Sequence, residues 1–183
     1  VKKNPIANWT VNNDTQCLVG NSFNFSTANA VAVSTFSKFT WDFGGAISNS
    51  QQNAINPSGI KYASAGVKNI RLIVEDKNAC TDTFESRIWV LPNPEALISS
   101  INPDSSCLRG NSWNFNGTTS TSNSGLGINS YSWDLSVSVS SSIASSSSPT
   151  NIKYSTSGIK DIKLIVRDVN VCYDTTSTAI KIN

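Results

Sequence analysis

The chain contains 183 residues with 14 basic and 12 acidic side chains, a net charge of +2 and no histidine. This charge balance, without a basic run, argues against a nucleic-acid partner, and no apolar stretch reaches the ~20 residues that span a bilayer. Without histidine, neither a Ser-His-Asp nor a Cys-His arrangement can form. We therefore expect a non-enzymatic, monomeric protein without membrane insertion.

The sequence repeats itself once. CLVGNSFNF at residues 17–25 returns as CLRGNSWNF at 107–115, and IRLIVED at 70–76 returns as IKLIVRD at 162–168. A repeat of this size is a whole domain rather than a rung of a solenoid. The sequence therefore predicts two copies of one module, at residues 1–91 and 92–183.

The two ends of the chain match the segment between the modules. VKKNPIA at residues 1–7 parallels VLPNPEA at 90–96, so Val1 corresponds to Val90. The tail AIKIN at 179–183 stops where the linker would begin. We therefore expect the chain to be a segment of a longer array of modules.

Alternation of apolar and polar residues predicts short strands in each module, separated by Asn-, Asp-, Pro- and Gly-rich turns. The alternating positions are, in chain order, Ala7, Trp9 and Val11; Phe23 and Phe25; Ile70, Leu72 and Val74; Phe84, Ile88 and Val90; Ala96, Ile98 and Ile101; Trp113 and Phe115; and Ile162, Leu164 and Val166. In the Ser/Thr-rich segment 116–150, alternation at Leu135, Val137, Val139 and Ile143 predicts an edge hairpin. About seven short strands in each module, without a helical pattern, favour an all-β antiparallel sandwich.

The four cysteines lie at matching positions, two in each module. The repeat favours one bridge within each module, Cys17 to Cys80 and Cys107 to Cys172, although four cysteines allow three connectivities. Zinc is less favoured because histidine and a C-x-x-C spacing are both absent. Widely separated cysteine pairs indicate an oxidising, extracellular compartment.

The modules resemble the PKD domain, an immunoglobulin-like sandwich. Its Trp-Asp-Phe-Gly strand corresponds to residues 41–44 and to WDLS at 133–136, and its Tyr-x-x-x-Gly segment corresponds to 62–66 and 154–158. Both copies lack the second Asp-Gly of that strand. The Asn-x-Cys-x-Asp segments at 78–82 and 170–174 are similar to PKD-type repeats of large secreted Bacteroidota proteins. These include gliding or attachment adhesins and multidomain hydrolases.

Three tryptophans are candidates for ligand platforms. Trp41 and Trp133 are better interpreted as core residues, since a strand tryptophan in such sandwiches packs between the sheets. Trp89 precedes the linker, and its counterpart is Lys181, at a position expected to face outward. We expect Trp89 to pack against the second module rather than to bind a ligand. The prolines of the linker, Pro92 and Pro94, favour extended backbone and a stiff connection.

Each module also carries three aspartates near its cysteines, as weak Ca²⁺ candidates. Carboxylates that meet on loops at one end could bind this oxygen-seeking ion, but aspartate also suits turns, and we expect no cofactor. These candidates are Asp14, Asp76, Asp82, Asp104, Asp168 and Asp174.

The sequence therefore favours structural spacer and interaction modules from the repeat array of a secreted or cell-surface bacterial adhesin, for attachment or gliding. The expected partners are neighbouring modules of the parent chain and a surface polysaccharide or protein. The alternative is an accessory polysaccharide- or protein-binding module of a secreted hydrolase. An exposed aromatic row on one sheet face would favour that alternative, and the sequence identifies none.

Overall fold

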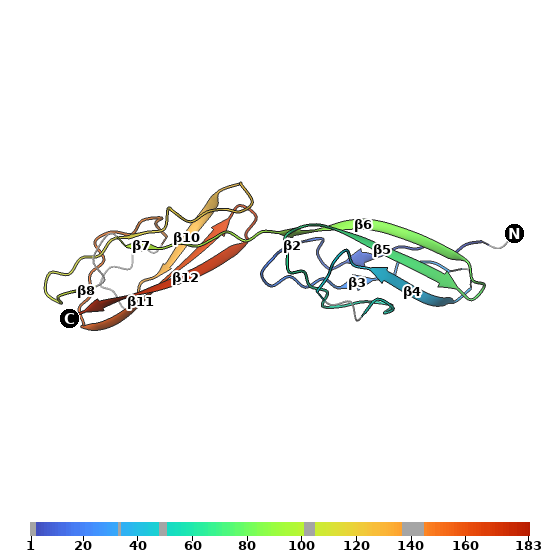
Figure 1. Cartoon of the computed structure of the whole chain (residues 1–183), viewed down its shortest axis with the longest axis horizontal. Coiled ribbons are helices and arrows are strands. Elements are labelled where there is room, and N and C mark those ends of the chain that lie inside the picture. Colours follow the sequence, from blue (N-terminus) through green and yellow to red (C-terminus); the bar gives the residue numbers. More distant parts are fainter. Residues whose placement is uncertain (1–2, 33, 48–50, 101–104, 137–144) are drawn as a thin grey trace. The chain divides into compact units, whose positions relative to one another are not determined.

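The computed structural model of the chain describes residues 3–32, 34–47, 51–100, 105–136 and 145–183, and these residues form strands without helices (Figure 1). The chain divides into two compact units, Val1–Pro92 and Asn93–Asn183, a boundary one residue from the expected one. We call these units the first and second module. The described residues include no helix long and apolar enough to cross a membrane.

Among its described residues, the first module has six strands in two sheets. They are β1 (Thr10–Val11), β2 (Thr15–Cys17), β3 (Phe25–Ser26), β4 (Phe36–Asp42), β5 (Gly66–Asp76) and β6 (Thr81–Leu91). The larger sheet has the order β2-β6-β5-β4, and β1 pairs with β3 in the smaller one. Isolated bridges from Ile6 to Val31 and from Phe23 to Ile60 extend the smaller layer. The module is therefore a two-layered, all-β sandwich.

The long hairpin of β5 and β6 forms because alternation continues through both strands. On β5, Ile70, Leu72 and Val74 are fully buried, while the residues between them are exposed or half-buried. The two strands pair in antiparallel register from Gly66 opposite Val90 to Glu75 opposite Thr81. The predicted last strand thus extends further than its alternation indicated, because pairing along β5 supports its polar first half.

The second module repeats this topology. Its strands are β7 (Ser99–Ser100), β8 (Ser105–Ser106), β9 (Phe115–Asn116), β10 (Ile128–Asp134), β11 (Gly158–Asp168) and β12 (Tyr173–Ile182). The larger sheet has the order β10-β11-β12-β8, and β7 pairs with β9. Of the hairpin predicted within 116–150, Val137, Val139 and Ile143 lie outside the described residues, whereas Leu135 is buried in the core.

Aromatic side chains from both layers form the core of each module. Trp9 and Phe25 come from the smaller layer, and Trp41 from the larger one; their rings pack with centroids 5.3–6.4 Å apart. In the second module, Trp113 and Phe115 stack with an interplanar angle of 9°. Sheets with interdigitating apolar inner faces are the stable solution for short strands.

A buried asparagine ties the segment after β2 to the segment before β5. The amide nitrogen of Asn21 donates to the carbonyls of Leu18 (2.6 Å) and Tyr62 (2.9 Å), and its oxygen accepts the Tyr62 amide (2.8 Å). Asn111 makes the same three bonds to Leu108 and Tyr154. These bonds explain the identical Gly-Asn-Ser segments of the two copies, since only a short amide side chain can both donate and accept here.

The turn after β4 explains where the chain departs from the PKD-like pattern. Gly44 has φ = +61°, and a Cβ there would lie 2.5 Å from the carbonyl oxygen of Asn69. At the equivalent place Ser136 adopts φ = +56° and donates its hydroxyl to the Asp161 carbonyl at 2.7 Å. Both copies thus keep a left-handed residue in this turn. In the first copy a glycine avoids the clash with Asn69, and in the second copy the Ser136 hydroxyl forms a hydrogen bond instead.

Candidate functional site

Each module has two ends that differ in chemistry. We call the end with the β5–β6 or β11–β12 turn the hairpin end, and the end where β6 or β12 finishes the exit end. Cys80 lies in the turn at the hairpin end, next to Thr81, the first residue of β6. Cys17 lies at the exit end, because β2 runs parallel to β6 and pairs Cys17 with Leu91. Every module therefore carries one cysteine at each end.

This placement contradicts the expected bridges within each module. Cys17 and Cys172 are disulfide-bonded, whereas Cys80 and Cys107 are free thiols. Ten residues of extended strand separate Thr81 from Leu91, or about 33 Å at 3.3 Å per residue, whereas a disulfide requires Cα atoms about 4.4–6.8 Å apart. The prediction failed because equal positions in a repeat do not reveal the register between its strands.

The two hairpin ends hold their cysteines in the same way. Asp76 accepts the amide of Cys80 at 3.0 Å, and Asp168 accepts the amide of Cys172 at 3.0 Å. The preceding residues, Ala79 and Val171, have φ values of 60° and 67°. A left-handed conformation is unfavourable for a β-branched valine. The hydrogen bonds that the carboxylates of Asp76 and Asp168 accept must therefore stabilise the two turns.

Burial opposes ionisation of Asp76, but hydrogen bonds outweigh that effect. The amides of Cys80 and Asn78 and the hydroxyl of Ser34 donate to its carboxylate, and they hold the pKa of Asp76 below its usual value. A carboxylate that accepts several such bonds is stabilised in its charged form. Asp76 is therefore a structural clamp of the turn.

The other described aspartates of the candidate set are tied to backbone amides or lie apart from one another. Asp82 accepts the amide of Ala7 at 2.7 Å, and Asp174 accepts the amide of Ala96 at 2.9 Å, so both anchor the segment that enters their module. Asp14 lies at the exit end, where its carbonyl accepts the amide of Trp89, far along β6 from Asp82. Asp104 lies outside the described residues, which contain no group of three metal-ligating side chains. In the first module, Asp14 thus lies at the other end of β6 from Asp82, so these candidate aspartates do not all meet on loops at one end.

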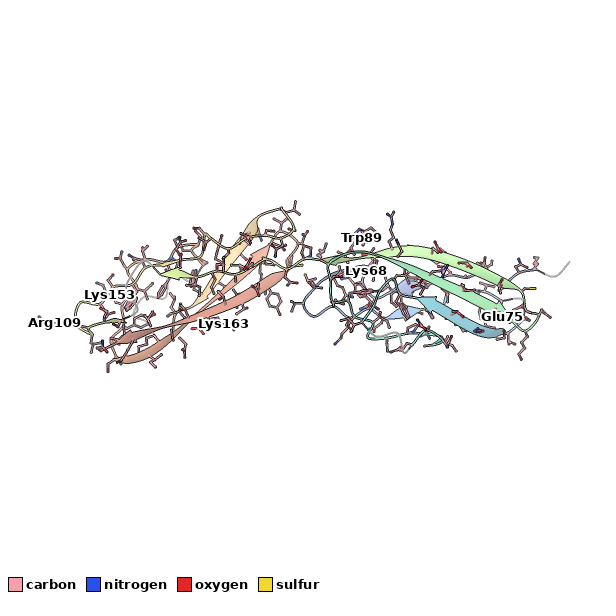
Figure 2. All side chains as sticks on the ribbon, viewed as in Figure 1. Lys68, Glu75, Trp89, Arg109, Lys153 and Lys163 are labelled. Atoms are coloured by element: carbon pink, nitrogen blue, oxygen red, sulfur yellow. The ribbon has the colours of Figure 1, made fainter. Side chains whose placement is uncertain are left out.

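The structure places the three singled-out tryptophans in two environments. Trp41 and Trp133 are 2% and 5% exposed and lie in the two cores, as expected. Trp89 is 38% exposed and stands on the outer face of the larger sheet (Figure 2), so its packing against the second module stays a prediction. No aromatic row accompanies it, because its described neighbours on β6 and β5 are Arg87, Val67 and Asn69.

A shallow hollow lies along β5 and β6, and its lining residue Arg87 is two positions from Trp89 on β6. It has a volume of about 410 Å³ and is lined by Asn69, Glu85, Ser86 and Arg87. Such amide, carboxylate and guanidinium groups can hydrogen-bond a sugar or a peptide. The second module does not repeat them, since Lys181 takes the place of Trp89 and Ala179 that of Arg87. Sequence reasoning missed this surface, because cross-strand register, not local sequence, brings β5 and β6 residues together.

A second hollow lies at the exit end of the second module. It measures about 480 Å³, and its lining includes Leu108, Asn111, Lys153 and Tyr154. Asn111 is committed to the backbone bonds described above, and the Tyr154 hydroxyl donates to the Leu135 carbonyl at 3.0 Å. These polar groups hold the fold together and do not form a reactive set.

Comparison with known proteins finds similar solved structures. No protein-family model and no curated protein matches the chain. Among solved structures, the PKD1 domain of Vibrio anguillarum Epp is 25% identical, covering 49% of this chain and 96% of its own, with a TM-score of 0.40. The PKD1 domain of the Vibrio cholerae metalloprotease PrtV is 24% identical over 48% of this chain and 98% of its own, with a TM-score of 0.39.

A structure described as carbohydrate-binding modules of the β-sandwich superfamily covers 100% of this chain and 86% of its own, at 11% identity and a TM-score of 0.43. The structural neighbours are thus PKD, fibronectin-III-like and carbohydrate-binding β-sandwich modules, which are non-catalytic domain types. The structure of this chain itself shows an all-β architecture of two compact sandwiches.

Proposed function

We propose that the two modules are structural spacers from the repeat array of a secreted bacterial cell-surface adhesin, serving attachment or gliding. One observation carries the proposal: the chain enters and leaves each module at opposite ends. In the first module it enters beside Asp82, which holds Ala7, and leaves at Leu91, nine residues further along β6. At 3.3 Å per residue, the module separates these two points by about 30 Å.

This arrangement also suits a chain under load. A force along the first module pulls along β6, which is hydrogen-bonded to β5 on one side and to β2 on the other. Antiparallel hydrogen bonds run perpendicular to the strands, so such a force shears many of them together rather than opening them one by one. The module is therefore built to keep its length while other parts of the parent chain bind.

Force spectroscopy of the chain in reducing buffer tests this proposal. We expect two unfolding peaks, each releasing about 270 Å, because roughly 90 residues extend at about 3.4 Å each and the folded module already spans ~30 Å. Modules that extend without resolvable peaks would contradict a load-bearing role.

Small-angle scattering tests the stiff linker: replacing Pro92 and Pro94 with glycine should broaden the distribution of interdomain angles.

The second candidate function is an accessory binding module for polysaccharide or protein in a secreted hydrolase. The observation that favours it is the exposed Trp89 on β6, the strand that also contributes Glu85, Ser86 and Arg87 to the lining of the hollow. Titration with soluble plant and bacterial polysaccharides separates the two functions. Saturable binding that disappears in Trp89→Lys, which installs the residue of the second module, would favour the binding module. Binding that is absent, or unchanged in this variant, leaves the spacer role.

A further inference from the structure

The two free thiols occupy the same positions as the two bonded cysteines. Cys80 corresponds in the repeat to Cys172, and Cys107 corresponds to Cys17. Cys172 and Cys17 are disulfide-bonded, whereas Cys80 and Cys107 are free. Each free thiol thus has an equivalent that already forms a disulfide, which a lone surface cysteine does not have.

The local geometry of the free and bonded positions is also the same. At the hairpin ends, the amides of both Cys80 and Cys172 donate to an aspartate at 3.0 Å, and the cysteine carbonyls accept that aspartate's amide at 3.0 and 2.9 Å. The free thiol of Cys80 is therefore presented on a turn that has the same two aspartate–cysteine hydrogen bonds as the turn of the bonded one. Cys172 is fully buried, but Cys80 remains partly exposed.

The exit ends match as well. The amide of Leu18, after Cys17, donates to the last strand at Leu91 over 2.8 Å, and the amide of Leu108, after Cys107, donates to Asn183 over 2.8 Å. Gly20 and Gly110 then turn the chain with φ values of 83° and 79°. Cys107 is exposed to solvent. Both free thiols are therefore accessible and held in a conformation that accepts a disulfide.

A partner within the same module is excluded by the strand register. Cys107 follows β8, whose Ser106 pairs with Ile182 at the end of β12, whereas Cys172 immediately precedes β12. About 30 Å of strand separates the two ends of the second module, as in the first. Neither free thiol can therefore pair with the other cysteine of its own module.

We propose that Cys80 and Cys107 are disulfide-forming sites for further modules of the same kind, with hairpin-end cysteines pairing only with exit-end cysteines. Cys80 takes an exit-end cysteine, and Cys107 takes a hairpin-end cysteine. A disulfide at either site joins this chain to a further module. This inference follows from the cysteine positions and does not depend on the proposed spacer role.

The bond forms by thiol–disulfide exchange with a disulfide oxidant, such as glutathione disulfide or an oxidised thiol–disulfide oxidoreductase. One cysteine thiolate attacks the oxidant's disulfide, forming a mixed disulfide and releasing one reduced thiol. The partner thiolate then displaces the second thiol of the oxidant. The two cysteines lose two protons and two electrons in total, and the oxidant's disulfide becomes two thiols.

The experiment uses the 183-residue chain and a four-module chain made from two copies of it. Ile182 of the first copy is joined directly to Lys2 of the second, because Val1 and Ile182 both correspond to Val90 in the repeat. This junction keeps the spacing from Cys107 to the next Cys80 within one residue of that from Cys17 to Cys172. Both chains are folded in an oxidising glutathione buffer, alkylated without reduction and weighed intact.

The 183-residue chain should take up two alkyl groups, at Cys80 and Cys107. The four-module chain should also take up two, at Cys80 of the first copy and Cys107 of the second, and peptide mapping should recover a bond between Cys107 of the first copy and Cys80 of the second. Four alkyl groups on the four-module chain, or a bond between two hairpin-end or two exit-end cysteines, would overturn the proposal.

Two matched variants distinguish specific pairing from random oxidation. Cys107→Ser in the first copy removes the partner of Cys80 in the second copy, so alkylation should rise from two groups to three. The same change in the second copy should lower it to one. If the first variant instead shows one group, the stranded thiol has paired elsewhere and end-specific pairing is wrong. Equal melting temperatures of the two variants would show that both fold alike.

Discussion

Replacing Asn21 with alanine should selectively destabilise the first module. The substitution removes three hydrogen bonds, of 2.6, 2.8 and 2.9 Å, between the Asn21 side chain and the backbones of Leu18 and Tyr62. Asn21 is only 5% exposed, so water cannot readily replace these partners. With a net contribution of about 1 kcal/mol for each bond, we expect a loss of roughly 3 kcal/mol.

This loss is large for a module of this size. At 0.05–0.15 kcal/mol per residue, a module of roughly 90 residues has an unfolding free energy of about 5–13 kcal/mol. A change of roughly 3 kcal/mol should lower its melting temperature by about 12–24 °C. Urea unfolding at 25 °C should show the same change as a midpoint shift of about 1–3 M.

Calorimetry should separate this effect by module. Asn21→Ala should lower one thermal transition and Asn111→Ala the other, because each asparagine bonds only within its own module. The exposed Asn53 provides a control, and its replacement with alanine should change neither transition by more than about 0.5 kcal/mol. A loss below about 1 kcal/mol for Asn21→Ala would refute the assigned contribution of these bonds.

Trp113→Phe should lower the unfolding free energy less than Trp133→Phe does, as measured by urea unfolding. The buried indole nitrogen of Trp113 has no hydrogen-bond partner among the described residues, whereas that of Trp133 donates to the Ser146 carbonyl at 2.8 Å. The difference should be roughly 1–3 kcal/mol, and equal losses would contradict it. The depressed pKa of Asp76 contributes stability above the unfolded value of about 4, and this contribution is lost as the pH falls through the lower folded value. The stability gap between wild type and Asp76→Asn should therefore shrink in acid, and a gap independent of pH would argue against the carboxylate clamp. Burial, followed by the nearby charge of Asp134, raises the pKa of Tyr154 to about 12. The neutral phenol should therefore stabilise the module fully below pH ~10, and this contribution to the unfolding free energy should fall between about pH 10 and 12. Absorbance titration should give the pKa, and urea unfolding should give the loss of stability. Melting curves in millimolar Ca²⁺ and in chelator should overlay, whereas a rise of many degrees would reveal a metal site.

Much of the fold could be predicted because its signals are local. Alternation at Ile70, Leu72 and Val74 indicates the strand that the structure shows as β5, and the repeat predicts the same strand in the second module. This prediction needed only the period of two that the backbone imposes on side-chain direction. The core positions of Trp41 and Trp133 were predicted because strand tryptophans of such sandwiches pack between the sheets, and both side chains are buried.

The tertiary structure alone decided what the cysteines and aspartates do. Because β2 pairs in parallel with the far end of β6, Cys17 and Asp14 lie at the exit end, while Cys80 and Asp82 lie at the hairpin end. Pairing between segments more than 60 residues apart sets these positions, and no pattern within either segment encodes that register. The sequence by itself determined that each module has two cysteines, with three of its aspartates near them in the chain. Only the strand register determined that the two cysteines of a module lie at opposite ends. The reason is that β2 pairs with the end of β6 that is far from Cys80, so the length of β6 separates Cys17 from Cys80.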